Sequence, residues 1–136
     1  KVGFFECGNL ENEYNLKKQN RGVYQKAFNW AKENDLDEAI LIDENGLLLE
    51  GSFTNLFILK EDKIYTPPIS LGIVSGCFRR LLNGQPFTSI KALTKEDFEN
   101  ADEIFLTNAL RGIIPVKTME DSLVLKLREK FHLDRL

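Results

Sequence analysis

The alternation of short apolar runs with turn residues is the feature that most constrains how this chain can fold. Residues 39–42 form an unbroken apolar run, which is typical of a buried strand, and residues 47–49 are three consecutive leucines. The turn between them ends in Asn45-Gly46. Asn-Gly between apolar runs is the strongest short-range signal for a β-hairpin, and we expect positive φ at both turn residues. The sequence therefore predicts a sheet of short strands in the middle of the chain.

Further elements follow on both sides of this hairpin. Residues 1–19 are predicted to be an extended or irregular lead-in. The Pro67-Pro68 pair ends a strand, because proline cannot donate to a strand ladder. Strands are expected at 55–59, 64–65, 87–93 and 104–106, and from 116 onward. Helices are expected at 22–33, 75–82 and 94–100, and from 122 onward. We find no linker that divides the chain, so the prediction is a single domain over 1–136, of the α/β class, with a mixed sheet and flanking helices.

Composition excludes several functional classes. The chain has 136 residues and a net charge of -3, with no long basic run, so we expect no nucleic-acid partner. The apolar runs are too short to cross a membrane. The two cysteines form no CxxC motif and only one histidine is present, so we expect neither a zinc site nor any other metal site. Reactivity must come from a lysine or a cofactor, and the cysteine usage fits a cytoplasmic protein.

The first residue is Lys1 rather than Met, and the opening residues lack the apolar length of a signal peptide. We therefore expect this chain to be a piece of a longer protein, in which an N-terminal region supplies part of any site.

Four polar segments interrupt the apolar pattern and are candidates for chemistry: 17–21, 50–55, 76–79 and 108–112. The first segment holds lysines that could attack a carbonyl, or that could simply form a solvated helix start. The second places Glu50 between two strands, where it could face a buried cation or lie on a surface bend. The third combines glycine with a helix start, which offers free amides to an anion such as phosphate, or is an ordinary helix entry.

Together these segments resemble the class IV aminotransferases, the fold-type IV pyridoxal-phosphate enzymes. The resemblance rests on four strings in this order: LKKQNR, DEAILIDENGLLLEGSFTNLF, IYTPPISLGIVSGCFRR and ADEIFLTNALRGIIPV. It implies the fold of the family's larger C-terminal domain, with the smaller N-terminal domain absent from this sequence. It also implies pyridoxal 5'-phosphate as cofactor, an amino-acid-like substrate and a homodimer.

The resemblance assigns roles to particular residues. Lys17 would form the Schiff base with the cofactor and move protons, and Lys18 is the alternative. Glu50 would pair with the pyridinium nitrogen. Phosphate would be bound at two segments, Gly76-Cys77-Phe78 through backbone amides and Asn108-Ala109 in a later loop. Relatives often carry threonine where this chain has Phe78, which can offer only its amide.

The Asn108–Gly112 loop and Arg21 are more similar to aminodeoxychorismate lyases than to the aminotransferases. We therefore expect a lyase that forms 4-aminobenzoate and pyruvate on the folate route, with Arg111 binding a substrate carboxylate. One alternative is a branched-chain or D-amino-acid aminotransferase. Another is a non-catalytic binding or interaction domain, since the family's N-terminal domain is absent from these 136 residues.

Overall fold

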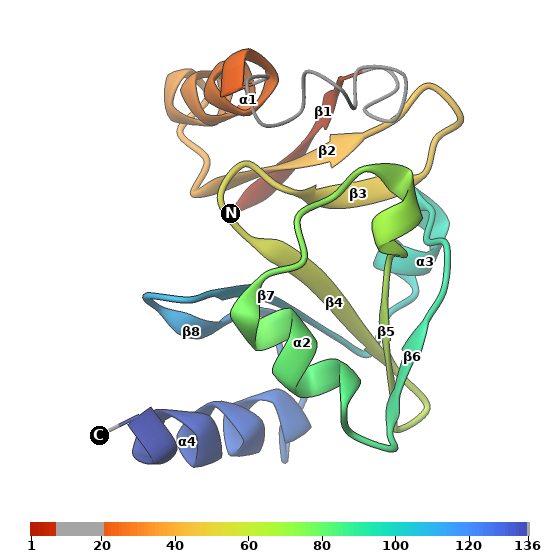
Figure 1. Cartoon of the computed structure of the whole chain (residues 1–136), viewed down its shortest axis with the longest axis vertical. Coiled ribbons are helices and arrows are strands. Elements are labelled where there is room, and N and C mark those ends of the chain that lie inside the picture. Colours follow the sequence, from red (N-terminus) through yellow and green to blue (C-terminus); the bar gives the residue numbers. More distant parts are fainter. Residues whose placement is uncertain (8–20, 136) are drawn as a thin grey trace.

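The computed structural model describes residues 1–7 and 21–135, and their strands form two sheets (Figure 1). The first sheet has the order β1-β2-β3 and the second has the order β6-β5-β4-β7-β8. The strands of the first sheet are β1 (Val2–Glu6), β2 (Glu38–Ile42) and β3 (Leu48–Gly51). Those of the second are β4 (Asn55–Lys60), β5 (Lys63–Thr66), β6 (Thr88–Ile90), β7 (Glu103–Asn108) and β8 (Gly112–Lys117).

Both sheets are mixed, as the sequence predicts. In the first, β1 pairs parallel with β2, and β2 pairs antiparallel with β3. In the second, β5 pairs parallel with β6, and the other pairs are antiparallel. The fold class is therefore confirmed, with two sheets where the sequence predicts one.

Helices lie on the outer faces of the two sheets (Figure 1). Helix α1 (Arg21–Glu33) packs on the first sheet through Ala27 and Ala31. Helices α2 (Cys77–Asn83) and α4 (Leu123–Arg135) pack on the second. Helix α3 (Lys95–Glu99) and the 3-10 helix η2 (Ile69–Leu71) are short connecting elements. None of the helices in the described part of the chain is long and apolar enough to cross a membrane.

The period-two alternation of β2 and β4 explains this layering. Ile40 of β2 and Leu56 of β4 belong to a buried cluster between the two sheets. Their neighbours point the other way: Leu41 contacts the α1 side, and Phe57 packs against α2 and α4, where it stacks on Phe105. Strands with both faces buried need the continuous apolar runs seen in the sequence.

The hairpin at Asn45-Gly46 forms, but its predicted turn geometry is wrong. Of the two turn residues only Gly46 has positive φ, at 81°. The Asp43 carboxylate accepts hydrogen bonds from the amides of Asn45 and Leu47, both at 2.9 Å, and this side-chain turn holds Asn45 at negative φ. A turn with two positive-φ residues occurs instead at Glu61-Asp62, between β4 and β5.

Candidate active site

Glu50 lies near the end of β3, where three separate segments of the chain donate hydrogen bonds to its carboxylate. Its Oε1 accepts from the Asn55 side chain at 3.3 Å and from the backbone N–H of Val74 at 3.1 Å. Its Oε2 accepts from the hydroxyl of Tyr24 on α1 at 2.5 Å. Only 2% of Glu50 is exposed. The sequence predicts a carboxylate between two strands, and the structure buries it and fixes both of its oxygens.

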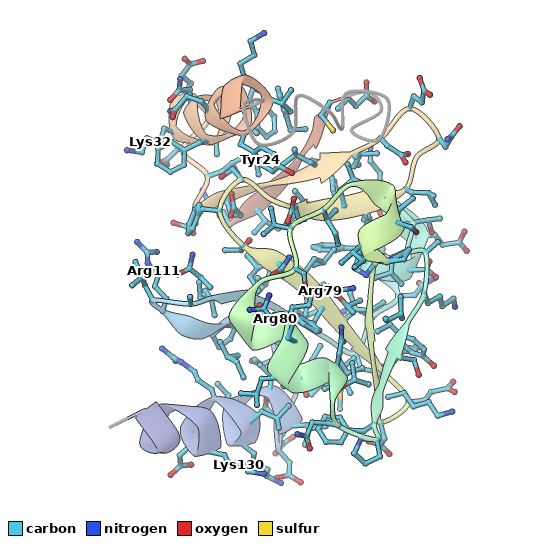
Figure 2. The ribbon with its side chains drawn as sticks, in the orientation of Figure 1. Tyr24, Lys32, Arg79, Arg80, Arg111 and Lys130 are labelled. Carbon is cyan, nitrogen blue, oxygen red and sulfur yellow. The ribbon has the colours of Figure 1, made fainter. Side chains whose placement is uncertain are left out.

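Arg79 of α2 is a buried cation in the same region. It is 3% exposed, and it donates to the carbonyl of Pro67 at 2.7 Å. Its Nε has no hydrogen-bond partner among the described residues. Burial lowers the pKa of Arg79, while the negative charge of Glu50 acts in the opposite direction. Figure 2 shows Arg79 beside α2 and Tyr24 on the strand side of α1.

A second buried carboxylate, Glu38 of β2, holds the turn between β3 and β4. Its Oε1 accepts from the backbone N–H of Ser52 at 3.0 Å and from the hydroxyl of the same residue at 2.5 Å. Its Oε2 accepts from the N–H of Phe53 at 3.3 Å and from the hydroxyl of Thr54 at 2.9 Å. The turn that separates Glu50 from Asn55 is therefore shaped by β2, the strand paired with β3.

A polar cradle lies where α2 begins. A Cβ atom placed on Gly76 would come within 2.5 Å of the Asn55 Oδ1, so only glycine fits there without moving that side chain. Thr107 of β7 is directly opposite Asn55 of β4, and directly opposed residues share one face of a sheet. Thr107 is 2% exposed, and its hydroxyl has no hydrogen-bond partner among the described residues. The first amides of a helix also lack intrahelical acceptors.

The β7–β8 turn is tied to the turn between β3 and β4. The Asn108 side chain donates to the carbonyl of Phe53 at 2.7 Å and accepts from the N–H of Leu110 at 2.8 Å. The guanidinium carbon of Arg111 lies 5.4 Å from the centre of the Phe53 ring. Ala109 is exposed at the tip of this turn. Figure 2 shows Arg111 at this end of the hairpin, close to the molecular surface.

The structure thus brings together Glu50, Gly76 and Asn108 as neighbours of one loop, with Arg111 at its edge. Lys17 and Lys18 lie outside the described residues, and the side chains of Cys77 and Phe78 are likewise not described. Sequence reasoning missed Tyr24 and Glu38. The helical period predicts only that Tyr24 lies on α1, and a glutamate at the first position of an apolar strand gave no sign of its five hydrogen bonds.

Residues 9–119 match the model of the family described as "Amino-transferase class IV". A D-alanine aminotransferase from Bacillus licheniformis is 36% identical over 96 residues, which cover 66% of this chain and 33% of that protein. A probable branched-chain-amino-acid aminotransferase from Thermotoga maritima is 37% identical over 93 residues, covering 64% of this chain and 34% of that protein. The chain thus spans about a third of the length of these curated relatives.

A solved structure shares the fold over almost the whole chain. This structure is a branched-chain amino acid aminotransferase complexed with N-(5'-phosphopyridoxyl)-L-glutamate, and it superposes with a TM-score of 0.82 at 23% identity. The match covers 96% of this chain and 50% of that one.

The expected lyase activity receives weaker support than its alternative. An aminodeoxychorismate lyase from Vibrio harveyi is 30% identical over 84 residues, covering 58% of this chain and 31% of that protein. The aminotransferases named above are more similar over longer stretches. The comparisons therefore favour the aminotransferase alternative over the lyase, and they do not support a role in folate synthesis specifically.

Proposed function

Because this chain belongs to the class IV aminotransferases, we propose that it is the pyridoxal-phosphate-binding part of an enzyme that transfers an amino group from an amino acid to a keto acid. The observation that carries the proposal is the Glu50 carboxylate, 2% exposed and held at both oxygens. Burial of a carboxylate is costly unless a partner offsets it, and a ring nitrogen carrying a proton is such a partner.

The described residues fit the cofactor. Glu50 would hold the ring nitrogen. The Thr107 hydroxyl is buried without a partner among the described residues, and it lies on the Asn55 side of the sheet, toward the glycine that opens α2. That hydroxyl would bind phosphate together with the amides of Gly76, Cys77 and Phe78 and with the Asn108-Ala109 turn. These amides and the hydroxyl are neutral donors of the kind that phosphate oxygens accept.

When bound, pyridoxal phosphate supplies an electron sink that acidifies the α-hydrogen of an amino acid. Lys17 would hold the cofactor through its aldehyde, and its Nζ would move the substrate α-proton, first as a general base and then as a general acid. Glu50 would keep the ring nitrogen of the cofactor protonated. Arg111, held on the Phe53 ring beside the site loop, binds a carboxylate of the substrate.

A lyase acting on aminodeoxychorismate is the second candidate, and the Vibrio harveyi relative is the observation that favours it. A lyase would use the same residues, and pyruvate would leave as the six-membered ring of the substrate becomes aromatic. Substrate tests separate the two. Steady formation of glutamate from 2-oxoglutarate with D-alanine or a branched-chain amino acid supports transamination, whereas pyruvate released from aminodeoxychorismate supports the lyase.

Cofactor attachment is tested on the full-length protein, including any sequence beyond these 136 residues. We expect purified protein to be yellow, to lose the yellow band on borohydride reduction, and to yield a labelled peptide in which Lys17 carries the cofactor. Lys18→Ala is the matched control and should retain the label, whereas Lys17→Ala should lose it. Label on Lys18 would overturn the assignment of the lysine, and a protein that binds no cofactor would overturn the proposed function.

A further inference from the structure

The contact between Tyr24 and Glu50 has no role in the function proposed above. Tyr24 is half-buried on α1, and its hydroxyl lies 2.5 Å from the Glu50 Oε2. The helix that carries it is fixed against the first sheet, because Ala27 and Ala31 are buried in the cluster that also contains Leu49, the residue before Glu50. The hydroxyl is therefore brought to Glu50 by a rigid element.

The two oxygens of Glu50 are held from different directions. Asn55 donates to the Oε1 and Tyr24 to the Oε2, and the Val74 amide donates to both, at 3.1 Å and 3.3 Å. Burial raises the pKa of Tyr24, and the negative charge of Glu50 raises it further. The hydroxyl therefore keeps its proton throughout the neutral range and always acts as a donor. A donor to a carboxylate stabilises the ionised form, and bonds to a charged acceptor are stronger than those to a neutral one.

We propose that Tyr24 is a positioning residue, which fixes the orientation and charge of Glu50 so that this carboxylate can hold the ring nitrogen of pyridoxal phosphate in its protonated form. The inference rests on the proposed function, because it assigns Glu50 to the ring nitrogen. The competing explanation is that the tyrosine only fastens α1 to β3. In that case its loss would affect every ligand of the site equally, whether or not the ligand carries a ring nitrogen.

The test measures equilibrium binding of two ligands to the full-length protein: pyridoxal 5'-phosphate, and its analogue with CH in place of the ring nitrogen. The wild type should bind the natural cofactor more tightly. Tyr24→Phe should weaken binding of pyridoxal phosphate by about tenfold and binding of the analogue by less than about twofold. Tyr65→Phe is the matched control, because Tyr65 lies on β5 with its ring against Lys91, and it should change neither affinity.

An unchanged preference for the nitrogen-containing ligand in Tyr24→Phe would overturn the inference, whether both ligands bind as in the wild type or both bind equally more weakly. In either case the proposed function stands if the wild type binds pyridoxal phosphate and prefers it to the analogue. If the wild type binds neither ligand, or binds both equally, the assignment of Glu50 fails and the inference fails with it.

Discussion

Replacing Glu38 gives the sharpest test of how the turn between β3 and β4 is held in place. The Glu38 carboxylate is 2% exposed and accepts five hydrogen bonds, four of them from the turn between β3 and β4. Removing this carboxylate in Glu38→Ala would leave the donors of Ser52, Phe53 and Thr54 without their acceptor. A buried donor that loses its partner destabilises the folded state by its full desolvation cost.

The expected loss follows from the geometry of these bonds. The bond from Phe53 at 3.3 Å and the local bond from Ala39 contribute least. The two donors of Ser52 and the hydroxyl of Thr54 lie at 2.5–3.0 Å and contribute about 1.5 kcal/mol each, the low end for bonds to a charged group. Water can replace part of the hydrogen bonding lost at the half-buried Ser52. We therefore expect Glu38→Ala to lower the free energy of unfolding by about 3 kcal/mol.

Glu38→Gln keeps the shape and one acceptor oxygen, so its loss should be smaller, about 1.5 kcal/mol. Glu99→Gln on the exposed end of α3 is the control, and it should stay within about 0.5 kcal/mol of the wild type. Urea unfolding of the full-length variants, followed by circular dichroism, measures all three. If Glu38→Ala costs no more than the Glu99→Gln control, the carboxylate does not hold the turn, and the reasoning from its hydrogen bonds is refuted.

Three further changes test separate parts of the structure. Gly76→Ala should weaken binding of pyridoxal phosphate by about tenfold, because its Cβ would come within 2.5 Å of the Asn55 Oδ1. Gly84→Ala is the control, since its Cβ would lie 3.5 Å from its nearest neighbour, and it should bind the cofactor normally in the same titration. Glu103→Gln should lower the free energy of unfolding by about 2 kcal/mol and speed hydrogen exchange in α4. The reason is that the Glu103 carboxylate accepts hydrogen bonds from Ser122 and from the amides of Leu123 and Val124. Unchanged exchange in α4 would contradict this prediction. The raised pKa of Tyr24 means that the folded state retains a proton that the unfolded chain releases above about pH 10, so stability falls as pH rises through that range. The free energy of unfolding should therefore fall less in Tyr24→Phe than in Tyr65→Phe as the pH rises from about 9 to about 11. Equal falls in the two variants would refute the raised pKa of Tyr24.

Local sequence signals predict the elements better than their pairing. The apolar run at 39–42 and the leucines at 47–49 form β2 and β3, and the helix expected at 94–100 forms α3, which begins with a capping box between Thr94 and Asp97. The residues at the N-terminus that are predicted to be an irregular lead-in contain a strand, β1. This strand pairs parallel with β2, although α1 lies between the two strands in the sequence. No local pattern encodes a partner so far along the chain. The division into two sheets depends on the same kind of long-range contact.

Site residues were predictable where the chemistry is contiguous in sequence. Glu50 and Asn55 lie five positions apart in one polar segment between two strands, so the sequence alone indicates a carboxylate beside a turn. Tyr24 and Glu38 reach that segment from α1 and β2. The hydrophobic pattern of each element predicts which of its own faces is buried, but not which distant residues that face contacts. A tyrosine on a helix and a glutamate at the start of a strand look like surface residues until the first sheet is assembled.

The two buried carboxylates differ in the source of their donors, and the proposed function assigns a role to only one of them, Glu50. The donors to Glu38 come from its own neighbour and from the turn at 52–54, so its burial is offset by a local unit that forms when β2 meets β3. The donors to Glu50 come from α1, from β4 and from the segment before α2, and the apolar cluster that packs α1 against Leu49 also contains Ile73, the residue before Val74. A fold that needed only to stabilise this strand end could place an apolar residue there at lower cost, because a buried charge is expensive even when it is hydrogen-bonded. In the proposed function the carboxylate is retained at this point because it would pair with the protonated ring nitrogen of the cofactor, in addition to its interaction with the buried Arg79.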